Sequence, residues 1–188
     1  MDGKLTEYAM RRNQAAADGS CLFHALGWLL NKAGVPVEDG KAVRMAICEK
    51  IKAEESLFAK LWNMLDSEGV ACLSWKKYGE HMKKLISRGG ELEILAAALE
   101  WNLQVFIWSQ EPSGGGEPTI YRIGASGIGT KKIWLLYNPS GRGHYDALDM
   151  HSSDERLKAA RIKLEKSVHP DNVLSSRSTK HFSQWSLF

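Results

Sequence analysis

The chain has 188 residues, of which 44% are hydrophobic and 25% charged, proportions typical of one soluble globular domain with a sizeable core. Its 25 basic and 22 acidic side chains give a net charge of +3, too weak an excess to predict nucleic-acid binding. The three cysteines are odd in number and widely spaced, so we expect no disulfide framework and a reducing compartment. No apolar run approaches the ~18–20 residues of a membrane span, and the first residues lack the apolar core of a secretory signal.

Helices are predicted for the first half of the chain. A polar lead-in, in which residues 8–12 form a short helix or a strand, precedes an almost wholly apolar segment at 21–32. Such a segment is typical of a buried central helix, and glycine and proline end it. Apolar residues recur at helical spacing in four further stretches, at 38–53, 56–65, 75–86 and 92–99.

After residue 102 the pattern changes to that of strands. Residues 103–108 form a short apolar run, and three more strands are predicted at 120–123, 133–137 and 144–150. A glycine-rich connection at 109–119 is predicted to be flexible, and a charged helix at 154–168 precedes a loosely ordered tail. Helices followed by a mainly antiparallel sheet predict an α+β fold.

A cysteine stands at the start of the apolar helix. The polar turn Asp18-Gly19-Ser20 leads directly to Cys21, and we expect Ser20 or Asp18 to cap the helix. At this position the free N–H groups and the helix dipole favour a thiolate. The dipole contributes roughly 0.3–1 kcal/mol, which lowers a pKa by less than about one unit. A cationic partner is therefore required.

His144 and Asp146 can supply that partner. Residues i and i+2 of a strand project from the same face about 6.5–7 Å apart, so the carboxylate can accept one imidazole N–H. The other ring nitrogen is then available to a thiol, which is the arrangement of nucleophile, base and orienting acid. Pairing with an imidazolium can lower a cysteine pKa by several units. Asp149 lies on the opposite face of this strand and is a poor orienting group.

Three blocks, at residues 18–24, 89–96 and 144–146, resemble in order and spacing the motifs of the ovarian tumour (OTU) family. The members of this family are papain-like cysteine proteases that remove ubiquitin, and the resemblance covers roughly residues 8–150. It implies a papain-like fold in which N-terminal helices pack on the sheet. It also implies three catalytic residues: the nucleophile Cys21, the general base and acid His144, and the orienting acid Asp146.

The resemblance further implies how substrate is held. Backbone N–H groups of a loop form the oxyanion hole, and the loop consists of Asp18, Gly19 and Ser20. The ubiquitin tail ends in Gly-Gly, so its channel must be narrow. Three glycines allow such close backbone approach, namely Gly89, Gly90 and Gly143.

The resemblance implies ubiquitin or polyubiquitin as substrate, with ubiquitin-like modifiers as further candidates, and no cofactor. We expect a monomer with a protease domain at 1–150 and a C-terminal helix and tail at 151–188. Its expected location is the cytoplasm, or the host cytosol if the chain is viral or bacterial.

Three alternatives remain open at this point. The chain could be a catalytically silent ubiquitin-binding module, or a protease that processes a parent polyprotein. Cys21 and His24 have the spacing of half a metal site, but Cys48 and Cys72 add no second pair of ligands. No metal is therefore expected.

Overall fold

The computed structural model describes residues 2–67, 74–109, 118–124, 127–140, 143–151, 154–168 and 173–174. Most of the predicted flexible loop, Cys72 and most of the tail lie outside these residues. The helices described are α1 (Asp2–Thr6), α2 (Cys21–Lys32), α3 (Gly40–Ala53), α4 (Glu55–Ser67), α5 (Trp75–Met82), α6 (Glu91–Glu100) and α7 (Glu155–Ser167). The strands described are β1 (Met10–Asn13), β2 (Leu103–Ser109), β3 (Thr119–Ile123), β4 (Lys131–Asn138), β5 (His144–Met150) and β6 (Val173–Leu174).

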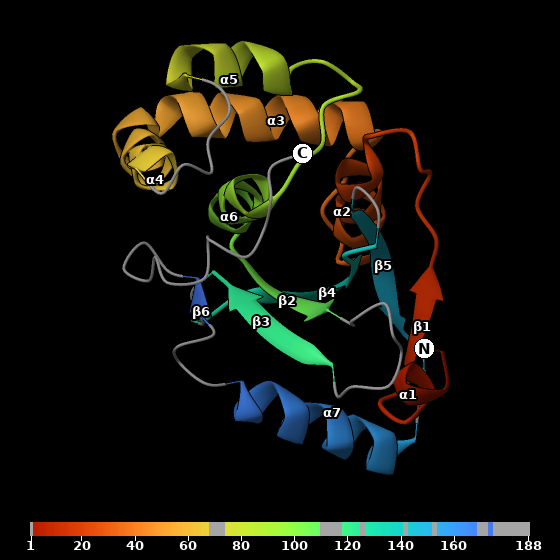
Figure 1. Ribbon diagram of the computed structural model, residues 1–188. Helices are drawn as coiled ribbons and strands as arrows, with labels where there is room; N and C mark the ends of the chain where they lie inside the picture. Colours follow the sequence, from red (N-terminus) through yellow and green to blue (C-terminus); the bar gives the residue numbers. More distant parts are fainter. Residues whose placement is uncertain are drawn as a thin grey trace.

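The strands form one sheet in the order β1-β5-β4-β2-β3-β6. The pairs β1–β5, β4–β5 and β2–β3 are antiparallel, whereas β2–β4 and β3–β6 are parallel. Helices α2 and α6 pack on one face of this sheet with α3, α4 and α5 beyond them, and α7 covers the other face (Figure 1). The predicted α+β fold with a mainly antiparallel sheet is confirmed.

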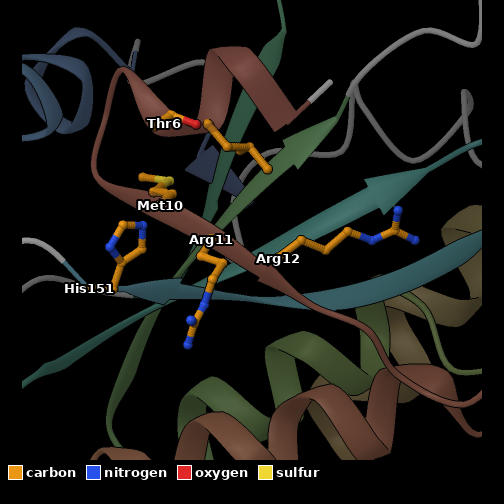
Figure 2. A pocket seen from close by; sticks show the side chains of 6 residues that line it. Thr6, Met10, Arg11, Arg12 and His151 are labelled. Atoms are coloured by element: carbon orange, nitrogen blue, oxygen red, sulfur yellow. The ribbon is translucent and has the colours of Figure 1, made fainter.

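The edge strand β1 lies beside an open pocket of about 300 Å³. Its lining comes from α1, β1 and the residue after β5: Leu5, Thr6, Met10, Arg11, Arg12 and His151. In Figure 2 the Arg12 side chain points away from Thr6 and His151. This guanidinium instead donates to Asp146 of the neighbouring strand.

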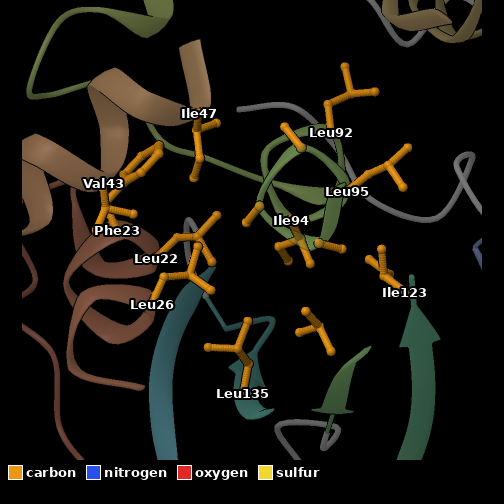
Figure 3. Close-up of a cluster of buried hydrophobic side chains, with 14 of the residues drawn as sticks. Leu22, Phe23, Leu26, Val43, Ile47, Leu92, Ile94, Leu95, Ile123 and Leu135 are labelled. Atoms are coloured by element: carbon orange, nitrogen blue, oxygen red, sulfur yellow. The ribbon is translucent and has the colours of Figure 1, made fainter. Parts of the chain in front are cut away.

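Helix α2 forms the centre of the larger core. Its side chains Leu22 and Leu26 meet residues from α3, α6 and β4, among them Val43, Ile47, Ile94 and Leu135 (Figure 3). Each such side chain is almost completely buried, and burial of a leucine contributes roughly 1.5–3 kcal/mol. This packing fixes the helix that carries Cys21 against strand β5.

A second cluster fills the other face of the sheet. Phe106 and Trp134 stack there with ring centroids 4.6 Å apart, and Leu164 and Val168 at the end of α7 pack against the cluster. Lys132 of β4 also donates to Glu165 of α7. The C-terminal helix therefore seals a face of the sheet that would otherwise expose aromatic side chains.

Most predicted elements appear within a few residues of their expected bounds, and α2 has the bounds expected of it. One extension was wrong. Helix α5 ends at Met82, so Leu85 and Ile86 lie in a connecting segment, where they are 52% and 77% exposed. The short elements α1 and β6 were not predicted. No helix in the described part of the chain has both the length and the apolar character needed to span a membrane.

Candidate active site

Cys21 is the first residue of α2, and 5% of its surface is exposed. The prediction that Ser20 or Asp18 caps this helix was wrong. The Ser20 hydroxyl donates to the Leu85 carbonyl at 2.6 Å, and Asp18 Oδ1 accepts the Ser20 N–H at 2.8 Å. Within the described residues, the N-cap Ser20 therefore gives the first-turn N–H groups of α2 no side-chain hydrogen bond.

The turn before Cys21 is tightly constrained. Gly19 has φ +88°, and an added Cβ would lie 2.6 Å from the Ile86 carbonyl oxygen, so only glycine fits there. Asp18 Oδ2 and His24 Nε2 lie 2.9 Å apart. This hydrogen bond, together with the one from the Ser20 N–H, lowers the pKa of Asp18. The carboxylate thus links the turn to the second turn of α2.

The guanidinium of Arg44, from α3, holds this turn against the segment that follows α5. Arg44 is fully buried, and its Cζ atom lies over the Phe23 ring, 3.8 Å from the ring centroid. Nη2 donates to Ser20 Oγ at 3.0 Å. The backbone carbonyls that also accept from Arg44 belong to Met82, Leu85 and Ser87. The buried Arg44 guanidinium thus joins the turn before Cys21 to the segment that follows α5.

His144 and Asp146 form a pair on β5. His144 Nε2 lies 3.0 Å from Asp146 Oδ1, as the spacing predicts, which leaves Nδ1 as the other ring nitrogen. Asp146 is fully buried, and two more donors reach it: the Ala15 N–H at 2.8 Å and Arg12 Nε at 2.7 Å. Three donors hold the carboxylate in one orientation.

Asp149, on the other face of β5, has different partners. Lys32 donates to it from the end of α2, and Arg11 lies 3.5 Å away. It therefore ties the sheet to α2 and β1, whereas Asp146 contacts the imidazole.

Two tyrosines lie next to each other on β4 and on β5, the strand that carries His144. The rings of Tyr137, from β4, and Tyr145, from β5, have centroids 4.7 Å apart. Burial raises the pKa of both phenols, and the charges of Glu91 and Cys21 raise it further. Cys21 and Tyr145, the residue that follows His144, belong to the same core cluster. Within the described residues, no hydrogen bond joins Cys21 to His144.

Cys48 is the other described cysteine, and both are free thiols. It lies within α3, and burial raises its pKa to about 11. It is therefore protonated at neutral pH and a poor nucleophile. In the described part of the chain, no cluster of three or more His, Cys, Asp or Glu side chains could hold a metal ion.

The three predicted channel glycines differ in their surroundings. A Cβ on Gly89 would lie 2.7 Å from Leu22 and 2.8 Å from Phe23, so this glycine allows α2 to pack closely. A Cβ on Gly90 would meet nothing within 4 Å. Gly143 has φ +72°, and its carbonyl accepts from Arg88 Nη1 at 2.8 Å.

Comparison with known proteins decides the family. Residues 16–145 match the family model of the OTU-like cysteine proteases. The chain belongs to this family. Among curated protein sequences, none matches this OTU-like protease.

Solved OTU domains share its fold. The OTU domain of OTUD1 has a TM-score of 0.59 and 18% identity, covering 79% of this chain and 91% of that one. The Hazara virus OTU bound to ubiquitin has a TM-score of 0.57 and 22% identity, with 79% and 86% covered. An OTU deubiquitinase from Wolbachia pipientis wMel bound to ubiquitin has a TM-score of 0.59 and 11% identity, with 75% and 96% covered.

Two arginines of this OTU-like protease contact the site, although the sequence did not predict a role for them. Arg44 stands in the buried stripe of α3 with Ile47 and Ile51, and a charged residue in an apolar stripe is a signal that could have revealed it. Arg12 has no such signal, because its partner Asp146 is 134 residues away in the sequence.

Arg44→Met is expected to lower the free energy of unfolding by about 3 kcal/mol or more, because it leaves several buried acceptors without a donor. Urea denaturation of the variant and the parent measures this loss. Lys41→Met, at an exposed position on the same helix, is the control and should change stability by less than about 0.5 kcal/mol. Equal stabilities of the two variants would contradict the role given to Arg44.

Gly89→Ala and Gly90→Ala distinguish a glycine that is needed for close packing from one that borders open space. The first forces a methyl group into Leu22 and Phe23 and should cost roughly 1–3 kcal/mol of stability, visible as a lower Tm. The second enters open space and should leave Tm within about 2 °C of the parent. Thermal unfolding of both variants tests this, and a larger loss at Gly90 would contradict the packing described.

Glu91→Gln should become more stabilising as pH rises. Burial raises the pKa of Glu91 from its ordinary 4.5 to about 8, so between these values the folded chain binds a proton that the unfolded chain has lost. Stability of the parent therefore falls with pH across that window, and glutamine removes this contribution. Urea denaturation at pH 5 and pH 8 measures it. A stability difference that is the same at both pH values would be inconsistent with a buried neutral carboxyl.

Proposed function

We propose that this OTU-like protease is a thiol-dependent deubiquitinase that hydrolyses the isopeptide bond after the C-terminal glycine of ubiquitin. The observation that carries the proposal is the His144–Asp146 pair on β5, against which α2 packs with Cys21 at its uncapped N-terminus. Ubiquitin enters because the related domains from Hazara virus and Wolbachia were solved with ubiquitin bound.

In the first step the Cys21 thiolate attacks the carbonyl carbon of the terminal glycine. His144 takes the thiol proton through Nδ1, because Asp146 occupies Nε2, and then protonates the leaving lysine amine. The product is a thioester on Cys21. In the second step His144 activates a water molecule, which releases ubiquitin and restores the thiol.

The oxyanion of each step is stabilised by backbone N–H groups. The donors we propose are those of the first turn of α2 and of the loop Asp18, Gly19 and Ser20. The first-turn groups have no side-chain cap, and Arg44 and Gly19 hold the turn in one shape. Loss of one such donor typically costs ~2.7–4 kcal/mol of transition-state stabilisation.

The same proposal covers the extent of the site and its setting. Residues 1–150 form the protease domain, and the channel for the ubiquitin tail passes Gly90 and Gly143. Two free thiols among the described residues agree with a reducing compartment such as the cytoplasm. Polyubiquitin and ubiquitin-like modifiers are further substrates to test, and the enzyme is proposed to act as a monomer.

Incubation with ubiquitin that carries a C-terminal electrophile should give a covalent adduct at Cys21. Mass spectrometry of the intact protein and of its peptides identifies the site. Cys21→Ala should form no adduct and should abolish cleavage of di-ubiquitin while it still binds ubiquitin. Cys48→Ala is the matched control and should react like the parent. Binding without any adduct in the parent would instead favour a silent ubiquitin-binding module.

His144→Ala should lower kcat/KM for ubiquitin–aminomethylcoumarin by about 10³ or more, because general acid–base catalysis is lost. Asp146→Asn should lower it less, since the amide oxygen can still accept from the imidazole. Asp149→Asn, on the other face of β5, is the control and should change kcat little. Equal losses in the His144 and Asp146 variants would contradict an orienting role for Asp146.

A further inference from the structure

Arg88 connects the two segments that carry the proposed channel glycines. It stands in the connection that leads to α6, and its Nη1 atom donates to the Gly143 carbonyl at 2.8 Å, 55 residues further along the chain. Gly143 immediately precedes His144, the first residue of β5. The acceptor oxygen therefore belongs to the peptide group that includes the His144 nitrogen. Because the donor is a guanidinium, the bond is charge-assisted, and such bonds are roughly twice as strong as neutral ones.

The backbone on both sides of Arg88 is held near the helix that carries Cys21. Before it, Ser87 is buried, and its carbonyl accepts from the buried guanidinium of α3 at 2.7 Å. After it, Gly89 packs so closely on α2 that an added Cβ would lie 2.7 Å from Leu22, the residue that follows Cys21. The arginine therefore extends from a segment whose position is fixed relative to the start of α2.

Among the described residues, β5 has a strand neighbour on one side only at His144. Strand β1 pairs with β5 from Ala147 to Met150, whereas His144 itself pairs with Asn138 of β4. The hydrogen bond to Asp146 fixes a ring nitrogen, but it does not fix the backbone from which the ring projects. The bond from Arg88 therefore restrains this backbone at the end of β5 that β1 does not reach.

We propose that Arg88 is a positioning residue that sets the separation of the His144 imidazole and the Cys21 thiol. It does so by tying the peptide group before His144 to the segment packed on α2. The inference rests on the proposed function, in which His144 must reach the thiol to take its proton. A displacement of about 1 Å can lower a rate by about 10²-fold, so one restraint at this point has a large effect on the chemical step.

The experiment compares Arg88→Met and Arg88→Lys with the parent on ubiquitin–aminomethylcoumarin. Methionine has no donor, so we expect kcat to fall roughly 10- to 100-fold while KM stays within about threefold of the parent value. Lysine offers a donor on a flexible stem and should recover part of that loss. Lys84→Met, which removes an exposed cation of the same segment, is the control and should leave both constants unchanged.

A second measurement needs no ubiquitin. Nuclear magnetic resonance of the protein with isotope-labelled histidine shows how firmly the His144 ring is held, and His144→Ala assigns its signals. In Arg88→Met these signals should broaden or divide, because the ring adopts more than one position. In Lys84→Met they should match those of the parent. The ring signals of the other histidines serve as the internal reference.

Three results would overturn the inference while the proposed function stands. A KM that rises without a change in kcat in Arg88→Met would make Arg88 a substrate contact, and a KM that falls would make it an obstacle in the channel. His144 ring signals unchanged in Arg88→Met would exclude a restraint on the imidazole. If Arg88→Met unfolds in a thermal melt, Arg88→Gln takes its place with the same expectations, because its amide is two bonds too short to reach the carbonyl. A parent that hydrolyses no ubiquitin substrate instead removes the proposed function, and the positioning role with it.

Discussion

The buried guanidinium of Arg44 is the constraint on which the site depends. Among the described residues it pairs with no carboxylate; its acceptors there are the Ser20 hydroxyl and backbone carbonyls at Met82, Leu85 and Ser87. Burial lowers its pKa, so the hydrogen bonds and the Phe23 ring must compensate for lost hydration. Met82 ends α5, and Leu85 and Ser87 follow it outside any helix or strand, so Arg44 supplies donors that regular structure would otherwise provide.

This constraint also explains why the N-terminus of α2 has no side-chain cap. Ser20 stands at the N-cap position, but its hydroxyl binds the Leu85 carbonyl and Arg44 instead of an N–H of the helix. A local interaction worth about 1 kcal/mol is replaced by tertiary ones, and the first-turn donors next to Cys21 remain available. In the same arrangement the Ile86 carbonyl lies so close to Gly19 that no residue with a Cβ fits there. The contacts that stabilise the turn before Cys21 therefore also keep the first-turn donors available for the proposed chemistry.

The features that the sequence predicted well are local in origin. The bounds of α2 follow from an apolar run with clear stop signals, and the His144–Asp146 contact follows from the two-residue repeat of a strand. The errors arose where distant residues compete. The Ser20 cap failed because of an acceptor 65 residues away, and the helical spacing beyond Met82 continued into residues that are exposed. Neither the parallel pairing of β2 with β4 nor the donors to Asp146 leave a local pattern.

The orientation of the proposed catalytic acid depends on a segment that precedes the family match. That match begins at residue 16, yet two donors to Asp146 are Arg12 of β1 and the Ala15 N–H just after it. Strand β1 reaches this position because it pairs antiparallel with β5, with Arg12 opposite Leu148. Without Arg12 of β1, Asp146 Oδ2 would lose this donor, and the imidazole and the Ala15 N–H would hold the carboxylate only through Oδ1. The edge strand is therefore part of the site, although nothing in its sequence resembles a catalytic motif.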